Sequence, residues 1–145
     1  MIVAGGIFMW KRFFATLCAC LIALVTMGAL RVQTLFPLSA LAGERTYYLD
    51  CASSQAVIKK ELSLRDIFRV KGQSVKLAET VTAEEIATRY RATLVDTERV
   101  GETVCYYYHI EGKTGVRVNG QTVNLHIAVT DTQTVVGAPF IFGSF

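Results

Sequence analysis

The stretch "TAEEIATRYRA" at residues 82–92 decides the fold, because it is the clearest helix in a chain otherwise rich in strand patterns. Thr82, followed three residues later by Glu85, forms a capping box. In this motif the hydroxyl accepts from one free backbone amide and the carboxylate reaches back to another. Ile86 and Tyr90 then begin a narrow apolar stripe on one side of the helix. Such a helix is expected to lie on one face of a sheet.

The chain after this helix reads as strands separated by turns. "TLVDTERV" and "TVCYYYHI" flank Gly101-Glu102, and Asn119-Gly120 is typical of a type I′ hairpin turn. "QTVNLHIAVT" at residues 121–130 alternates cleanly. One face of that strand is predicted to hold Val123, Leu125, Ile127 and Val129. Pro139 cannot donate to a ladder, so the final strand is predicted to be an edge or to contain a bulge.

The residues before the helix also favour strands. "TYYLD" at 46–50 predicts a first strand, and "SSQAVIKKELS" fits either a short helix capped by Ser53 or Ser54 or a strand. "DIFRVKGQSVKL" at 66–77 predicts a hairpin that turns near Lys71-Gly72. Together the patterns predict an α+β fold, an antiparallel sheet with one main helix at about residues 82–92 packed on one face.

The N-terminus is a different kind of sequence. Residues 13–30 carry no charge and lie between Lys11-Arg12 and Arg31. As a helix they span about 27 Å, close to the hydrocarbon thickness of a bilayer. This length favours a retained anchor that contacts the lipid bilayer through residues 13–30. Ala40-Leu41-Ala42 is nevertheless an A-x-A pattern, so a signal peptide cut between Ala42 and Gly43 is the alternative.

Two further features of this segment bear on its processing. Cys18 and Cys20 lie in a loose lipobox-like context, but another apolar run follows them, so they are interpreted as small packing residues. Met9 would give a normal charged signal start, "MWKRFFATLC", so translation from Met1 and from Met9 are both open. The predicted organisation is a signal peptide or anchor at 1–31, a linker at 32–45 and an extracytoplasmic domain at 46–145.

Charge excludes one class of partner. The chain has 15 Lys+Arg and 12 Asp+Glu, and the excess comes entirely from Lys11, Arg12 and Arg31. The domain that follows is therefore neutral. It lacks the attraction to phosphates on which nucleic-acid binding depends, so no nucleic-acid partner is expected.

The cysteines and histidines permit several chemistries and favour none. Cys51 and Cys105 could form a disulfide outside the cytoplasm, or could remain partly buried thiols. A hydrolase would need Cys105 beside His109 or His126, and His109 is too far along the same strand, about 13 Å away. No C-x2-C or H-x3-H spacing is present, so neither a metal site nor a cofactor is expected. No catalytic residue is assigned.

The aromatic run Tyr106, Tyr107 and Tyr108 is the main candidate for binding. In a strand Tyr107 faces opposite to its two neighbours, so core packing explains one face, whereas the other could stack on a sugar, a peptide or a partner. With His126 on the polar face of its strand, these tyrosines form the predicted ligand- or partner-binding set.

The C-terminal sequence "VRVNGQTVNLHIAVTDTQTVVGAPFIFGSF" resembles the YwmB-like family of small exported proteins of spore-forming bacteria and their relatives. The resemblance covers roughly residues 84–145. It implies a fold similar to the saddle of the TATA-box-binding protein without a role on DNA, and it carries over no catalytic residues. A link to sporulation is expected only through this resemblance.

The sequence thus predicts a non-enzymatic interaction module of the bacterial cell envelope, either anchored in the cytoplasmic membrane with its domain outside or secreted. An envelope protein is the expected partner. The alternative is a small envelope ligand-binding protein or a Cys/His hydrolase.

Overall fold

The computed structural model describes residues 4–35, 37–51 and 55–141. The chain divides into two compact units, Met1–Thr34 and Leu35–Phe145. The helices are α1 (Ala4–Leu35), the 3-10 turn η1 (Ile67–Arg69) and α2 (Ala83–Tyr90). The strands are β1 (Gly43–Leu49), β2 (Val57–Lys59), β3 (Val70–Leu77), β4 (Thr93–Val100), β5 (Thr103–His109), β6 (Val116–Val118), β7 (Gln121–Val123), β8 (Leu125–Val129) and β9 (Thr134–Ala138).

The first unit consists of α1. Within it Arg12–Leu30, 19 residues, is long and apolar enough to cross a membrane, and none of it is buried in the protein. Its large side chains are openly exposed, including Phe13 at 67% and Val25 at 70%. An apolar helix of this length near the N-terminus fits a membrane anchor or a signal peptide.

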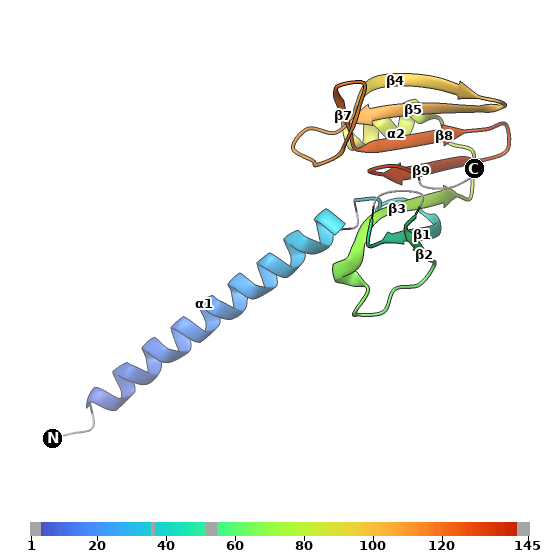
Figure 1. Cartoon of the computed structure of the whole chain (residues 1–145). Coiled ribbons are helices and arrows are strands. Elements are labelled where there is room, and N and C mark those ends of the chain that lie inside the picture. Colours follow the sequence, from blue (N-terminus) through green and yellow to red (C-terminus); the bar gives the residue numbers. More distant parts are fainter. Residues whose placement is uncertain (1–3, 36, 52–54, 142–145) are drawn as a thin grey trace. The chain divides into compact units, whose positions relative to one another are not determined.

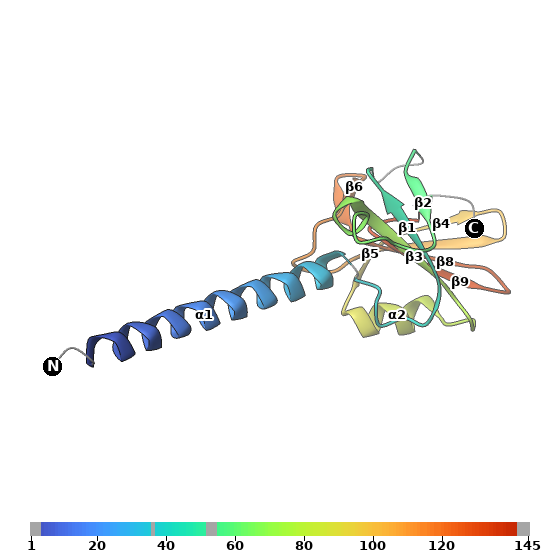
Figure 2. The same cartoon turned by 90° about the horizontal axis from the view of Figure 1, so that it is seen from below.

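The second unit confirms the predicted α+β fold. Seven strands form one antiparallel sheet in the order β2-β1-β3-β9-β8-β5-β4, and β6 and β7 form a separate hairpin (Figure 1). Figure 2 shows α2 lying on one face of this sheet. Helix α2 connects β3 to β4 in the chain. Because β3 and β4 are not neighbours in the sheet, this connection crosses the face of the sheet.

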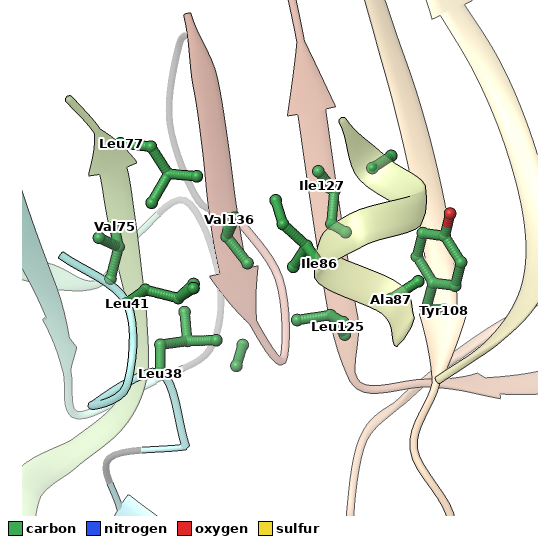
Figure 3. Packing of buried hydrophobic residues seen from close by; sticks show 12 residues of the cluster. Leu38, Leu41, Val75, Leu77, Ile86, Ala87, Tyr108, Leu125, Ile127 and Val136 are labelled. Carbon is green, nitrogen blue, oxygen red and sulfur yellow. The ribbon is translucent and has the colours of Figure 1, made fainter. Parts of the chain in front are cut away.

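Each face of the sheet has its own apolar cluster. The α2 face packs Ile86 and Ala87 of the helix against Val75, Ile127 and Val136 of the sheet (Figure 3). The opposite face carries Cys105, Tyr107, Val123, Ala128, Val135 and Ile141. The sheet is thus apolar on both sides, and this explains why its central strands β9 and β8 are almost entirely buried.

The segment just before β1 belongs to the core of the second unit. Leu38 and Leu41 are 0% and 4% exposed and lie in the same cluster as Val75 and Val136 (Figure 3). The turn is closed by Leu41 N–H donating to Leu38 O at 3.1 Å, and Arg45 donates to Leu41 O at 2.6 Å. Residues 38 and 41 therefore differ from the linker predicted at 32–45, since apolar side chains within reach of a sheet face are buried there.

Two local predictions were wrong, and one open alternative was resolved. Lys71-Gly72 is not a turn, because β3 runs through it and Gly72 pairs with Tyr48 of β1. The ambiguous segment forms β2, so its strand interpretation holds, while the proposed caps Ser53 and Ser54 lie outside the described residues. The last strand is not an edge: β9 lies between β3 and β8, and Pro139 follows its final residue.

The predicted continuous strand at 121–130 is also interrupted. Asn124 separates β7 from β8, with its carboxamide accepting from Ile110 N–H at 2.6 Å and donating to Ile110 O at 2.8 Å. Because of this break, Val123 packs on the opposite face from Leu125. The Asn119-Gly120 turn is as predicted, with both residues at positive φ, 49° and 82°.

Candidate functional site

The tyrosine run on β5 is divided between the two faces, as alternation predicts. Tyr106 and Tyr108 lie on the α2 face, where their rings stack with centroids 6.4 Å apart. Tyr107 lies on the opposite face with His126, its directly paired residue on β8. The four residues of the predicted binding set therefore form two separate clusters, and each has to be considered by itself.

The α2 face contains a groove of about 700 Å³ between the helix and the outer strands β5 and β4. We call it the α2–β4 groove. It is lined by Thr82, Ala83, Glu84, Ala87, Thr88, Arg91, Ala92, Leu94, Tyr106 and Tyr108. The tyrosine rings give it an aromatic side, Leu94 adds apolar surface that is 52% exposed, and Glu84 and Arg91 contribute one charge of each sign. Such a surface is suited to a mainly apolar, uncharged segment.

The groove exists because α2 is short and held firmly at both ends. Thr82 Oγ1 accepts from Glu85 N–H at 3.3 Å, and Glu85 Oε2 accepts from Thr82 N–H at 3.1 Å, which confirms the capping box. Arg91 ends the helix in the left-handed conformation. Thr134 Oγ1 donates to Val81 O at 2.8 Å and so ties the start of the helix to β9. Because α2 lies over β8 and against Tyr108 of β5, only the outermost strand β4 is left largely exposed (Figure 3).

Strand β4 forms one open edge of the sheet. It pairs with β5 alone among the described strands, and nearly all of its residues are exposed. A bulge lies between Leu94 and Asp96. Charged residues such as Glu98 and Arg99 are typical of edge strands that avoid indiscriminate pairing. The groove and the open edge therefore adjoin each other at Leu94.

The opposite face holds a compact group of three rings. The ring of His126 stacks on that of Tyr107, with centroids 4.7 Å apart, and is tilted against that of Phe140, with centroids 4.9 Å apart. The chain after Pro139 turns back over Gly137, and Ile141 N–H donates to His126 Nδ1 at 3.4 Å. This hydrogen bond places the imidazole proton on Nε2 when the ring is neutral. His126 is 2% exposed, so this group belongs to the core.

Burial shifts the ionisation of this cluster away from charged forms. The pKa of His126 is lowered to about 4 by burial. The pKa of Tyr107 is raised by burial and by its hydrogen bond to Glu98, whose Oε2 accepts from the phenol at 3.0 Å. Both groups are therefore neutral near pH 7, and they are packed rather than presented to a ligand.

The arrangement weighs against a Cys105–His126 nucleophilic pair. Cys105 pairs with Ala128 across the strands, not with His126, and it is 1% exposed. Burial, together with nearby Glu98, raises the pKa of the Cys105 thiol. A cysteine nucleophile needs the opposite shift, because the thiolate is the reactive form.

No disulfide joins Cys51 to Cys105. Cys51 follows β1, and three strands separate β1 from β5 in the sheet, a distance of about 19 Å at normal strand spacing. A disulfide requires Cα atoms within about 7 Å. Among the residues that the structure describes, no group of three or more His, Cys, Asp or Glu side chains could hold a metal ion.

Sequence reasoning found the tyrosines but missed the other side of the groove. Leu94, Thr88 and Arg91 line it together with Tyr106 and Tyr108. A signal for Thr88 and Arg91 was present, since Arg91 follows Ala87 by four residues and Thr88 by three, and this spacing places residues on one side of a helix. Leu94 carried no such signal, because its exposure depends on β4 being the last strand of the sheet.

The chain matches no family model, no curated protein and no solved structure.

Proposed function

We propose that this protein is a non-enzymatic interaction module of the cell envelope, anchored in the cytoplasmic membrane by α1 with its domain outside, and that it binds an extended polypeptide segment at β4 and the α2–β4 groove. The observation that carries the proposal is the aromatic groove of about 700 Å³ lying beside an open sheet edge. The resemblance to the YwmB-like family is compatible with this function, since it implies no activity.

An extended polypeptide is favoured as the occupant because it satisfies both features at once. A strand added beside β4 would form backbone hydrogen bonds with the open edge, about 4.8 Å from it. Every second side chain of that strand would then face the α2 side, where Leu94 and Tyr106 offer apolar contact. A small ligand would use the groove and leave the edge unsatisfied.

The burial of Leu38 and Leu41 supports a retained anchor over a signal that is cleaved after Ala42. Cleavage there would remove two core leucines that are 0% and 4% exposed. Losing a buried leucine side chain costs about 2–5 kcal/mol, and a small domain has only about 5–15 kcal/mol in total. Gly43 also begins β1, paired with Leu77, so the proposed cleavage site adjoins the sheet itself.

The test is a selection of binding peptides from a random extended library, using the full chain in nanodiscs. Binders should lose affinity by tenfold or more with Tyr106→Ala, and should retain it with Tyr47→Ala, a matched half-buried tyrosine near the other edge of the sheet. N-methylation of a bound peptide should abolish its binding when the methylated amide faces β4, and should leave binding unchanged when the methylated amide faces away.

Other outcomes would overturn the proposal. Binders that are indifferent to Tyr106→Ala would place the interaction elsewhere, and an absence of binders would remove the peptide as a partner. A glycan array could instead give ligands whose binding is lost with Tyr106→Ala, while N-methylated and unmodified peptides bind with equal affinity. In that case the small-ligand alternative would replace the proposed peptide partner.

A further inference from the structure

The edge of the sheet opposite to β4 carries an unusual apolar surface. We call residues 57–71, from β2 through η1 to the start of β3, the β2–β3 lobe. Its Leu64 and Phe68 side chains are 82% and 80% exposed, and Val57 and Ile58 are 48% and 58% exposed. Single exposed apolar residues are common on protein surfaces, but four on one short lobe indicate a surface that binds an apolar partner or a membrane.

Leu64 and Phe68 are held outward by an ionic network beneath them. Asp66, between them in sequence, is 3% exposed and accepts from Lys59 Nζ and Ser63 Oγ, each at 2.8 Å. These contacts hold the pKa of Asp66 well below its usual range. Arg69 makes a two-pronged contact with Asp50 through Nε at 2.8 Å and Nη2 at 2.6 Å. The loop is therefore ordered by its charges while its apolar side chains face solvent.

The lobe also carries cations without acidic partners. Lys59 pairs with Asp66, Lys60 with Glu44, and Arg69 with Asp50 and Asp66. Within the described part of the chain, Arg65 and Lys71 form no ion pair, and both are exposed. Arg65 is adjacent to Leu64 in sequence. Exposed apolar side chains beside unpaired cations are the pattern of a surface that meets anionic headgroups and the acyl boundary.

The chain itself brings a bilayer within reach of this lobe if α1 is retained. Leu30 ends the candidate span, and Leu38 is already in the core of the domain. Residues 31–35 are still helical and rise about 1.5 Å each, and the three steps from Leu35 to Leu38 add at most about 11 Å, so this connection spans at most about 18 Å. A domain of this size has a radius of gyration of about 13 Å, so only surface near the tether can reach the bilayer. The lobe is such a surface, because it leads into β3, whose Val75 lies in one apolar cluster with Leu38.

We propose that the β2–β3 lobe docks on the membrane that holds α1, inserting Leu64 and Phe68 into the interface and placing Arg65 and Lys71 at anionic lipid headgroups. This inference rests on the proposed retention of the anchor. The lobe and β4 are at opposite edges of the seven-stranded sheet, about 29 Å apart at normal strand spacing. A docked domain therefore keeps β4 and the α2–β4 groove away from the lipid and open to a partner.

The experiment uses the full chain in nanodiscs whose lipids carry brominated acyl chains, which quench nearby tryptophan. Trp10 is the single tryptophan, so Trp10→Phe removes the background, and Phe68→Trp then reports on the lobe. Val100→Trp is the matched control, because Val100 is an exposed apolar residue, at 51%, on the opposite edge. The expected result is a blue shift and loss of emission for Phe68→Trp and solvent-like, unquenched emission for Val100→Trp.

A comparison of lipids and a second reporter separate the outcomes. Quenching of Phe68→Trp should be stronger with phosphatidylglycerol present than in phosphatidylcholine alone, and equal quenching would overturn the role of Arg65 and Lys71. A blue shift without quenching would mean that a second copy of the chain covers the lobe, and it would overturn the inference. In the same Trp10→Phe background, Leu21→Trp at the middle of the candidate span reports on the anchor. Quenched Leu21→Trp with unquenched Phe68→Trp would refute lobe docking alone, whereas unquenched Leu21→Trp would refute the anchor.

Discussion

Replacing Leu38 by Ala tests whether the residues before β1 belong to the domain. Leu38 is 0% exposed and lies against the α2 face among Leu41, Val75 and Val136 (Figure 3). Truncating a buried leucine leaves a cavity and costs about 2–5 kcal/mol. For a urea dependence of about 1–3 kcal/mol per molar, this corresponds to a fall in the unfolding midpoint of at least about 0.7 M.

The assay is urea unfolding of the full chain in detergent micelles, followed by the near-ultraviolet circular dichroism of tyrosine. All six tyrosines lie between residues 47 and 108, so this signal reports the domain, while Trp10 reports α1. Leu64→Ala is the matched control, because Leu64 is 82% exposed and its truncation should change the stability by less than about 0.5 kcal/mol. Equal midpoints for the two variants would refute the assignment of Leu38 to the core.

Three further predictions concern the sheet and its helix. Burial lowers the pKa of His126 from 6.5 to about 4, so the unfolded chain takes up a proton at a higher pH than the folded chain does. The free energy of unfolding should therefore have its full value above about pH 6.5 and should fall toward pH 4 by at most about 3 kcal/mol. Urea midpoints at pH 7, 5.5 and 4 measure this, and a constant midpoint over that window would contradict it. Thr82→Ala should destabilise the domain by about 0.5–2 kcal/mol through loss of the helix cap while Thr82→Ser should not, and thermal unfolding of both variants would show no difference if the cap were unimportant. Gly137→Ala should destabilise by about 1–3 kcal/mol, since its Cβ would lie 2.5 Å from Ile141 Cγ1 and 2.7 Å from Ile141 N; a melting temperature equal to that of the unchanged protein would show that the chain after Pro139 does not pack there.

Local patterns predicted the parts of the fold that depend on near neighbours in sequence. The capping box at Thr82, the positive-φ turn at Asn119-Gly120 and the opposite facing of Tyr107 were all readable because each follows from a few adjacent residues. The α+β class followed from one periodic helix among alternating strands.

The features that depend on strand order could not be read. β9 is central because β3 pairs with it across the sheet, and nothing near Pro139 indicates this pairing. The break at Asn124 depends on hydrogen bonds to Ile110, fourteen residues away. In the same way, the α2–β4 groove exists only because β4 is the outermost strand. The strand order, the break at Asn124 and the groove all depend on pairing between residues that are distant in the sequence, and one sequence alone does not show which strands pair.

Residues 38–41 differ most from the structure that their sequence predicts. The sequence offered Ala40-Leu41-Ala42 as a cleavage pattern, whereas the structure places Leu41 in the core and has its carbonyl accept from Arg45. A short apolar segment after a proline reads as a linker until the sheet face that receives it is known. Because these residues are buried, cleavage after Ala42 would remove part of the domain core together with the N-terminal helix.

The most direct measurement is the N-terminal sequence and intact mass of the protein recovered from cells that express the full gene. We predict that the protein is found in the membrane fraction, that α1 is still joined to the domain, and that no N-terminus is found at Gly43. A soluble protein that begins at Gly43 and unfolds with the stability of the full chain would contradict both the retained anchor and the structural role of Leu38 and Leu41.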